Sequence, residues 1–103
     1  MATMVHAVIL LNVQRDQINQ VAERFAAVDG IAEVYSVAGQ YDLVVMARTR
    51  DNDGLADLVT NHLLREAGVV RSETLIAFRV DSRYDLEHMF SLGMEESAPG
   101  RKK

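Results

Sequence analysis

The sequence contains no cysteine, and it carries less positive charge than negative charge. Without cysteine there is no disulfide framework, no thiolate metal site and no thiol nucleophile. Lys and Arg number 11 against 15 Asp and Glu, which gives a formal net charge of −4 and a pI near 5.2. Because nucleic-acid phosphates are bound by clustered Lys and Arg, this balance argues against nucleic acid as a direct partner.

Long hydrophobic runs are also lacking. The apolar run at residues 5–13 is too short to span a membrane, and no basic residue precedes it. It therefore predicts neither a signal peptide nor a membrane span, and we expect a cytoplasmic protein. No Gly-rich phosphate loop, nucleophile elbow or zinc signature occurs in the sequence.

The three histidines do not form a metal-binding pattern. His6, His62 and His88 fall on a predicted strand, a predicted helix and the C-terminal tail, without i, i+4 pairing or a carboxylate at ligand spacing. We therefore predict surface or structural roles for them, with no metal and no cofactor.

The 103 residues suffice for one domain with one core, and hydrophobic residues make up 49% of them. Period-2 or continuous apolar patterns predict strands at residues 4–13, 31–38, 42–49 and 69–80. Period-3.6 patterns predict helices at residues 15–28 and from about residue 51 to Gly68. A short helix is predicted at residues 85–90. The domain is expected to cover residues 1–92 with a short C-terminal extension, followed by a disordered tail at residues 93–103.

Each predicted helix has one apolar face and recognisable ends. Asp16 or a neighbour is expected to cap the first helix, which Asp29-Gly30 stops; residues 51–53 are expected to supply the caps of the second. The apolar faces consist of Ile18, Val21, Ala22, Phe25 and Ala26 in the first helix, and of Leu55, Leu58, Val59, Leu63 and Ala67 in the second.

The element order β-α-β-β-α-β predicts an α+β fold, the ferredoxin-like sandwich with strand order 4-1-3-2. The first and third strands are apolar on both faces, as central strands should be. They carry no aromatic residue, which excludes an RNA-binding sheet of this topology. Two helices cover only one face of four strands, so we predict that a second copy covers the other face in a two-fold dimer.

The stretch Gly39-Gln40-Tyr41-Asp42 joins two apolar runs through a tight reversal. Glycine supplies the positive φ that such a turn usually requires, and its backbone groups are candidates to be offered to a ligand. The alternative is a plain hairpin turn with an aromatic plug.

The last predicted strand contains two hydroxyls, Ser72 and Thr74, on one face. They are either ordinary strand residues or the lining of a small-molecule site. Arg71 is either part of a solvated edge or an anion anchor.

These segments carry a resemblance to a known family. Gly30-Ile31, the run Val37-Ala38-Gly39-Gln40-Tyr41-Asp42-Leu43 and the run Gly68-Val69-Val70-Arg71-Ser72-Glu73-Thr74 resemble the effector-binding (RAM) domain of Lrp/AsnC transcription regulators over about residues 4–80. Only residues 1–3 precede the first strand, so the chain resembles the stand-alone form that lacks the helix-turn-helix.

The resemblance implies a regulatory function and no catalysis. It implies dimers through the sheet faces, of the dimeric α/β-barrel type, that assemble into rings (octamer or decamer). It also implies a small-molecule effector, an amino acid, bound between dimers, and a DNA-binding Lrp/AsnC paralogue as a partner. The implied ligand-binding residues are Gly39, Gln40, Tyr41 and Asp42, with Ser72 and Thr74 from a neighbouring dimer. Gln40, where the family commonly has a charged residue, leaves the ligand class open.

Two other classes of protein share this topology. A dimeric α/β-barrel enzyme, such as a cofactorless monooxygenase or a haem-dependent relative, would need an interior acid or histidine, for which His6 and His62 are the candidates. An ACT-like regulatory module would need a ligand-binding glycine between the first strand and helix, where this chain has Asn12-Val13-Gln14-Arg15.

Overall fold

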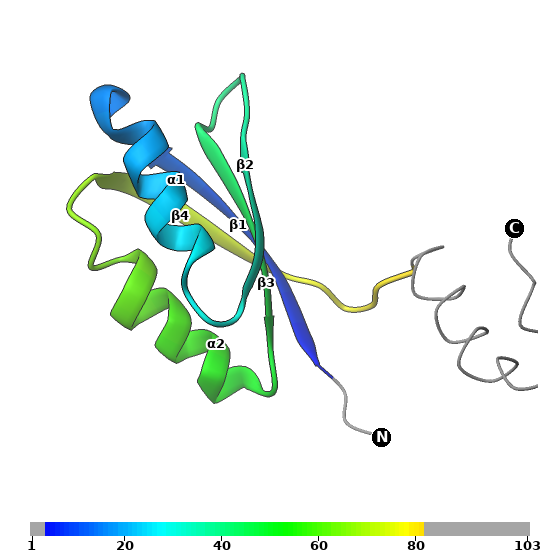
Figure 1. Ribbon diagram of the computed structural model, residues 1–103. Helices are drawn as coiled ribbons and strands as arrows, with labels where there is room; N and C mark the ends of the chain where they lie inside the picture. The colour runs from blue at the N-terminus through cyan, green and yellow to red at the C-terminus, as the bar shows by residue number, and fades with distance from the viewer. Residues whose placement is uncertain (1–3, 82–103) are drawn as a thin grey trace, which may run out of the picture.

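The fold is a four-stranded antiparallel sheet with two helices packed on one face, as a computed structural model of residues 4–81 shows (Figure 1). The elements are β1 (Val5–Val13), α1 (Ile18–Ala26), β2 (Ile31–Ser36), β3 (Leu43–Thr49), α2 (Asn52–Leu58) and β4 (Val69–Ile76). The strand order β2-β3-β1-β4 confirms the predicted ferredoxin-like topology. The helix predicted at residues 85–90 and the tail at 93–103 lie outside the described residues.

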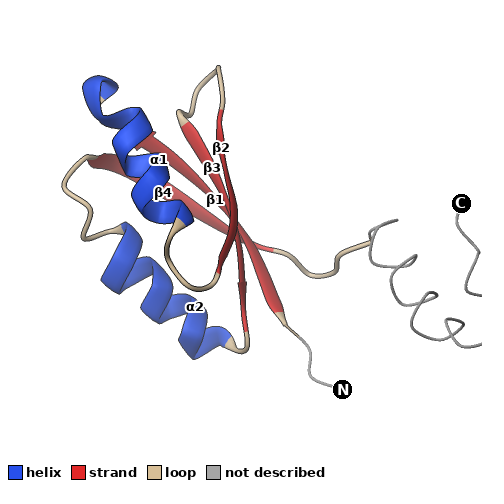
Figure 2. Cartoon of the chain, in the orientation of Figure 1, coloured by secondary structure: helices blue, strands red, loops and turns tan. Residues whose placement is uncertain are grey.

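The strand register decides which side chains face the helices. β1 pairs with β3 from Val5 opposite Thr49 to Leu11 opposite Leu43, and with β4 from Ala7 opposite Ile76. Side chains alternate between faces along a strand, and directly opposed residues share a face. The odd-numbered residues of β1 therefore point toward the helices, which lie together on one side of the sheet (Figure 2).

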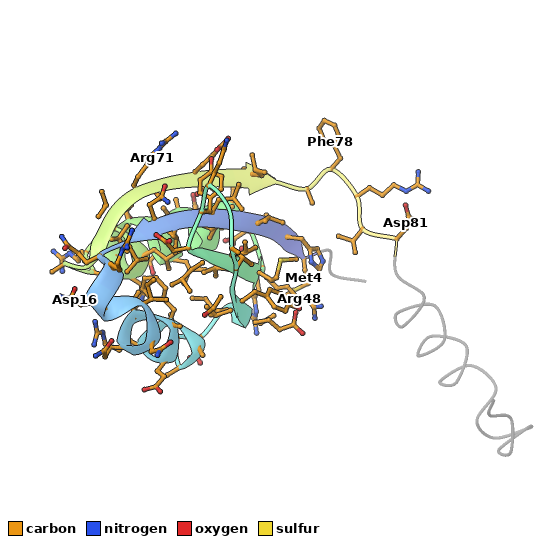
Figure 3. The ribbon with its side chains drawn as sticks, turned by 90° about the horizontal axis from the view of Figure 1, so that it is seen from above. Met4, Asp16, Arg48, Arg71, Phe78 and Asp81 are labelled. Carbon is orange, nitrogen blue, oxygen red and sulfur yellow. The ribbon has the colours of Figure 1, made fainter. Side chains whose placement is uncertain are left out.

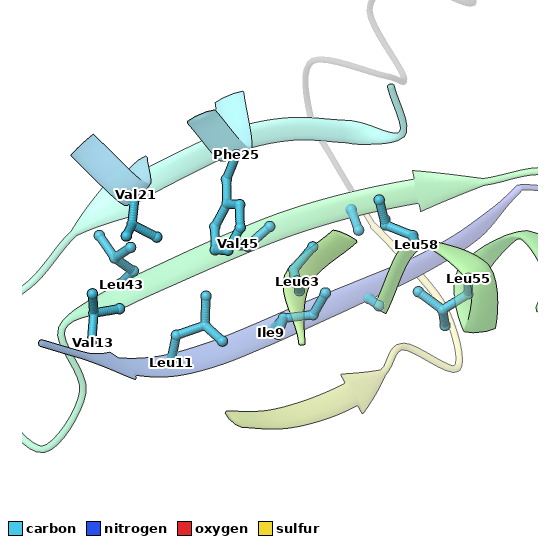
Figure 4. Close-up of a cluster of buried hydrophobic side chains, with 12 residues drawn as sticks. Ile9, Leu11, Val13, Val21, Phe25, Leu43, Val45, Leu55, Leu58 and Leu63 are labelled. Atoms are coloured by element: carbon cyan, nitrogen blue, oxygen red, sulfur yellow. The ribbon is translucent and has the colours of Figure 1, made fainter. Parts of the chain in front are cut away.

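The core fills the space between the sheet and the helices (Figure 4). Phe25 and Val21 of α1 pack down onto the sheet, where Ile9 and Val45 are fully buried. Burial of such side chains stabilises the fold by about 1.5–3 kcal/mol each. The buried residues are Ala7, Ile9, Leu11, Val13, Val21, Phe25, Leu43, Val45, Ala47, Leu55, Leu58 and Leu63.

The opposite face of the sheet has no helix on it, and we call it the open face. Its centre is apolar and half-buried, and its margin carries charges of both signs. By strand register, the centre consists of Val8, Leu10, Val44 and Met46, and the margin of His6, Glu33, Tyr35, Arg48, Arg71, Glu73 and Leu75. Arg71 points away from the helices (Figure 3).

Two strands are shorter than predicted. β2 ends at Ser36 rather than at residue 38, because Val37 already donates its N–H to the carbonyl of Asp42 (3.0 Å) and belongs to the turn. β4 ends at Ile76 rather than at residue 80. Ala77 still donates to the carbonyl of His6 (2.9 Å), but within the described residues no regular strand continues beyond it.

The first helix begins and ends differently from the prediction. A 3₁₀ turn at Arg15–Gln17 precedes α1, and no side chain caps either segment, so the predicted cap by Asp16 is wrong. α1 ends at Ala26, before the predicted stop at Asp29-Gly30, and Gly30, with φ +96°, belongs to the turn that leads into β2. Ala26, predicted to lie on the apolar face, is exposed rather than part of the core. It is the last residue of α1.

The second helix is capped as predicted but ends early. The Asp51 carboxylate accepts the Gly54 N–H at 2.7 Å. The last turn, Val59–Leu63, is π-helical, and the chain then leaves the helix well before Gly68, so Ala67 is exposed. Gly68 instead packs closely against α1 and the turn before it: a Cβ there would lie 2.8 Å from Gln17 Oε1, which can move aside, and 3.1 Å from Val21 Cγ2.

Candidate functional site

The Gly39–Asp42 turn is the predicted site, and the structure confirms its special backbone. Gly39 has φ +130°, a conformation that residues with a Cβ rarely adopt. A Cβ built there meets nothing within 4 Å. The glycine is therefore required by the backbone conformation and not by crowding.

Three hydrogen bonds fasten this turn to the end of β1, and a fourth closes the turn on itself. Asp42 donates its N–H to the Leu11 carbonyl (2.8 Å), and its Oδ2 accepts the N–H of Val13 (2.9 Å). Asn12 Nδ2 donates to the Gln40 carbonyl (2.8 Å), and Val37 closes the turn onto Asp42. Oδ2 of Asp42 thus accepts the N–H of Val13 beyond the point where β1 and β3 stop pairing, at Leu11 opposite Leu43.

Tyr41 ties the same turn to β4. Its hydroxyl donates to Glu73 Oε1 at 2.7 Å. This hydrogen bond raises the pKa of Tyr41, with smaller contributions from partial burial and from the Glu73 charge, while the nearby Arg71 opposes the shift. Tyr41 therefore stays a neutral hydrogen-bond donor throughout the physiological pH range.

Ser72 and Thr74 lie on the other side of the sheet from Glu73. They oppose the buried residues Leu11 and Ile9, so their side chains share the helix-covered face. Within one protomer they do not converge with Tyr41, which contacts the open face. Any contribution of Ser72 and Thr74 to a site at this turn must come from another copy of the chain.

The sequence analysis missed Asn12 and Glu73 as partners of the turn. The available signal was the alternation along β4, which places Arg71 and Glu73 together on the face opposite to Ser72 and Thr74. The sequence pattern did not indicate that the turn passes across the end of β1, where it reaches both residues.

The exposure of the turn limits what a single protomer can bind. Gly39 and Gln40 are exposed, whereas Tyr41 and Asp42 are half-buried. A small ligand held here would keep one side in water unless a second protomer closed the site.

No catalytic arrangement is evident within residues 4–81. No polar or charged side chain in this range is buried, and no three potential metal-ligating side chains gather there. His6 lies opposite Arg48 on the open face and His62 is exposed in the π-helical turn, so neither is enclosed within one protomer. No helix in the part of the chain described is long and apolar enough to cross a membrane.

One well-formed ion pair lies away from the turn. Arg24 of α1 contacts Glu66, in the connection to β4, through two hydrogen bonds of 2.9 and 2.7 Å. The hydrogen bonding from Arg24 lowers the pKa of Glu66, although partial burial opposes that effect. This pair joins α1 to the segment after α2 and has a structural role.

Comparison with known proteins establishes the family. Residues 6–84 match the Lrp/AsnC ligand binding domain, and the chain belongs to this family. An uncharacterized HTH-type transcriptional regulator of Pyrococcus abyssi is 32% identical over 59 residues, which are 57% of this chain and 39% of that protein. The chain thus spans well under half the length of this regulator.

Solved structures show the same fold. The protein TTHA0845 of Thermus thermophilus is 40% identical, with a TM-score of 0.72 over 77% of this chain and 99% of that one. A transcriptional regulator of Neisseria meningitidis, solved in complex with L-methionine, is 16% identical with a TM-score of 0.70 over 77% of this chain and 53% of that one. The ferredoxin-like fold and the family resemblance are therefore confirmed. The Pyrococcus abyssi relative is a transcriptional regulator, which does not favour the enzyme alternative.

Proposed function

We propose that this chain is a non-enzymatic, cytoplasmic regulatory domain that binds a free amino acid at the Gly39–Asp42 turn. The observation that carries the proposal is the geometry of the turn, which combines exposed backbone at Gly39 and Gln40 with one uncommitted oxygen of Asp42. The L-methionine complex of the Neisseria meningitidis regulator, which shares the fold, supports an amino acid as the effector.

The chemistry of the turn suits a zwitterion. The ammonium group of an amino acid needs acceptors, which the Asp42 carboxylate and turn carbonyls supply, and its carboxylate needs donors, which turn N–H groups supply. Because free amino acids are small, a useful affinity requires that a neighbouring protomer bury the rest of the ligand. Ser72 and Thr74 of that protomer are the proposed second wall.

Assembly of the chain follows from the open face. Its apolar centre and mixed-charge margin have the composition of a protein interface, and we propose that two copies dimerise through it. We further propose that dimers form rings with the effector between them, as an octamer or a decamer, and that a DNA-binding Lrp/AsnC paralogue is the downstream partner.

Binding is tested by a thermal-shift screen with the twenty amino acids, followed by calorimetry with the best of them. We expect at least one to raise Tm and to bind with measurable heat. If none of the twenty binds the assembled protein, the proposed function is wrong.

The role of the turn is tested with Asp42→Asn. This variant keeps a carbonyl oxygen for the Val13 N–H but removes the charge. If the carboxylate meets the ammonium group, affinity should fall about 10- to 100-fold, as for a charged hydrogen bond. Asp53→Asn, in the first turn of α2, is the matched control and should bind normally. Normal binding by Asp42→Asn would exclude Asp42 as the ammonium acceptor.

A further inference from the structure

The Tyr41–Glu73 hydrogen bond joins two parts of the sheet that are not neighbours. Tyr41 lies in the connection between β2 and β3, whereas Glu73 is on β4, and β1 lies between β3 and β4 in the sheet. The Tyr41 side chain therefore crosses the end of β1 on the open face. The Tyr41–Glu73 bond is the only side-chain hydrogen bond between this turn and β4 in the part of the chain described.

The other tethers of the turn all lead to β1. Asn12 holds the Gln40 carbonyl, and Leu11 and Val13 hold Asp42. These contacts fix the turn at Asp42 and at the Gln40 carbonyl. The Tyr41 hydroxyl supplies a separate attachment, and a carboxylate acceptor makes it stronger than a neutral hydrogen bond.

The protein contains a second tyrosine–glutamate pair that serves as an internal comparison. Tyr35 donates to Glu33 at 2.6 Å, also on the open face. Both residues belong to β2 and are two positions apart. The strand already fixes their relative positions, so this bond adds no restraint between separate elements. The two pairs have the same chemistry and nearly the same length, but only the Tyr41 pair restrains a turn.

We propose that Glu73 is a positioning residue for the Gly39–Asp42 turn and acts through the Tyr41 hydroxyl. This inference rests on the proposed function for its consequence in binding, but it concerns a residue that the resemblance did not assign to the site. Glu73 holds the turn against the open face, and the turn then presents its exposed backbone in one conformation. A ligand binds such a pre-organised turn more tightly, because less conformational freedom is lost on binding.

Amide hydrogen exchange of the turn tests the positioning role without any ligand. Four variants are compared with the wild type. Tyr41→Phe and Glu73→Ala remove the bond, Glu73→Gln keeps an acceptor oxygen, and Tyr35→Phe removes the comparison bond.

We expect Tyr41→Phe and Glu73→Ala to raise the exchange rate of the Asp42 amide, which donates to the Leu11 carbonyl, about 2- to 10-fold, the effect of losing one modest hydrogen bond. Glu73→Gln should stay close to the wild type, and Tyr35→Phe should not change the turn. An unchanged rate in Glu73→Ala overturns the proposal. So does an equal increase in Tyr35→Phe, or a Glu73→Gln variant as perturbed as Glu73→Ala.

Calorimetry with L-methionine tests the consequence for binding. Affinity should fall in Tyr41→Phe and Glu73→Ala by a factor similar to the change in exchange rate, and Glu73→Gln should restore it. Full affinity in Glu73→Ala contradicts a role in positioning. If the wild type does not bind L-methionine at millimolar concentration, methionine is excluded as the effector, and the exchange rates alone decide the role of Glu73.

Discussion

Asp42 shows how one residue can serve structure and function together. Its Oδ2 accepts the N–H of Val13, a residue that is only 6% exposed, at the irregularity where β1 and β4 change register. A sequence pattern identifies such an aspartate as a turn residue or a ligand-binding residue, but it does not reveal a hydrogen bond to an amide 29 positions away. That contact exists only once β1 and the turn are folded together.

Removing the Asp42 side chain should therefore destabilise the protein even without ligand. Asp42→Ala leaves the Val13 N–H without its acceptor, and we expect the free energy of unfolding to fall by about 1–3 kcal/mol. Asp42→Asn, which retains an acceptor oxygen, should lose less than half as much. Urea denaturation of both variants measures this difference, and equal stability of Asp42→Ala and the wild type would contradict the structural role.

Protonation of Glu66 should reduce the stability of the protein at acid pH. The pKa of Glu66 is lowered from its ordinary value of 4.5, chiefly by the hydrogen bond from Arg24. A carboxyl group with a lowered folded-state pKa stabilises the protein above its unfolded-state pKa, and this stability is lost as the pH falls through the lower folded-state value.

The matching variant is Glu66→Gln. Arg24 is half-exposed, so we expect a Tm at pH 7 only about 2–6 °C below that of the wild type, and the gap should narrow below pH 4.5. Glu23→Gln, on the exposed side of α1, should show no such gap. Scanning calorimetry between pH 3 and 7 measures the Tm of both variants and the wild type. A Tm difference between Glu66→Gln and the wild type that grows toward acid pH would contradict the prediction.

At the scale of elements, hydrophobic periodicity predicted which segments form helices and strands and how they are ordered. It succeeded because β1 and β3 are apolar on both faces and each helix has one apolar stripe. The ends were less well predicted. β4 ends at Ile76, and the second helix closes with a π-helical turn in which Leu63 is fully buried. Hydrophobic periodicity alone does not mark either of these ends.

The turn element depends on Gly39 for its backbone conformation. Gly39→Ala meets no steric obstacle, so its cost comes from φ +130° alone, and we expect a loss of about 1–3 kcal/mol in the free energy of unfolding. Gln40→Ala keeps the carbonyl that accepts from Asn12 and should stay within about 0.5 kcal/mol of the wild type. Chemical denaturation compares the two, and a fully stable Gly39→Ala protein would mean that the turn adopts another conformation.

At the scale of the whole molecule, the open face is the surface through which we propose that two copies dimerise. The sequence predicted that one face needed a cover, and the register now shows that Val44 lies on that face while Val45 is buried under the helices. The sequence alone could not show which of the two valines faces the helices, because both are apolar. The assignment follows from the pairing of β3 with β1.

Val44→Glu should dissociate the proposed dimer. An unpaired carboxylate at the centre of an apolar interface should weaken self-association by at least about 100-fold, as for an uncompensated buried charge. Ala56→Glu, at an exposed position of α2 outside the open face, should associate like the wild type. Sedimentation velocity distinguishes them. A wild-type protein that is a stable monomer at micromolar concentration would remove the dimer from the account.

The most direct measurement of the central claim is hydrogen exchange by mass spectrometry, with and without the amino acid that gives the largest thermal shift. We expect slower exchange in the peptide that covers residues 37–43 when that amino acid is bound, because the ligand contacts this turn. The α1 peptide, on the far face of the sheet, should change little. Binding confirmed by calorimetry without protection of residues 37–43 would place the site elsewhere and contradict the account.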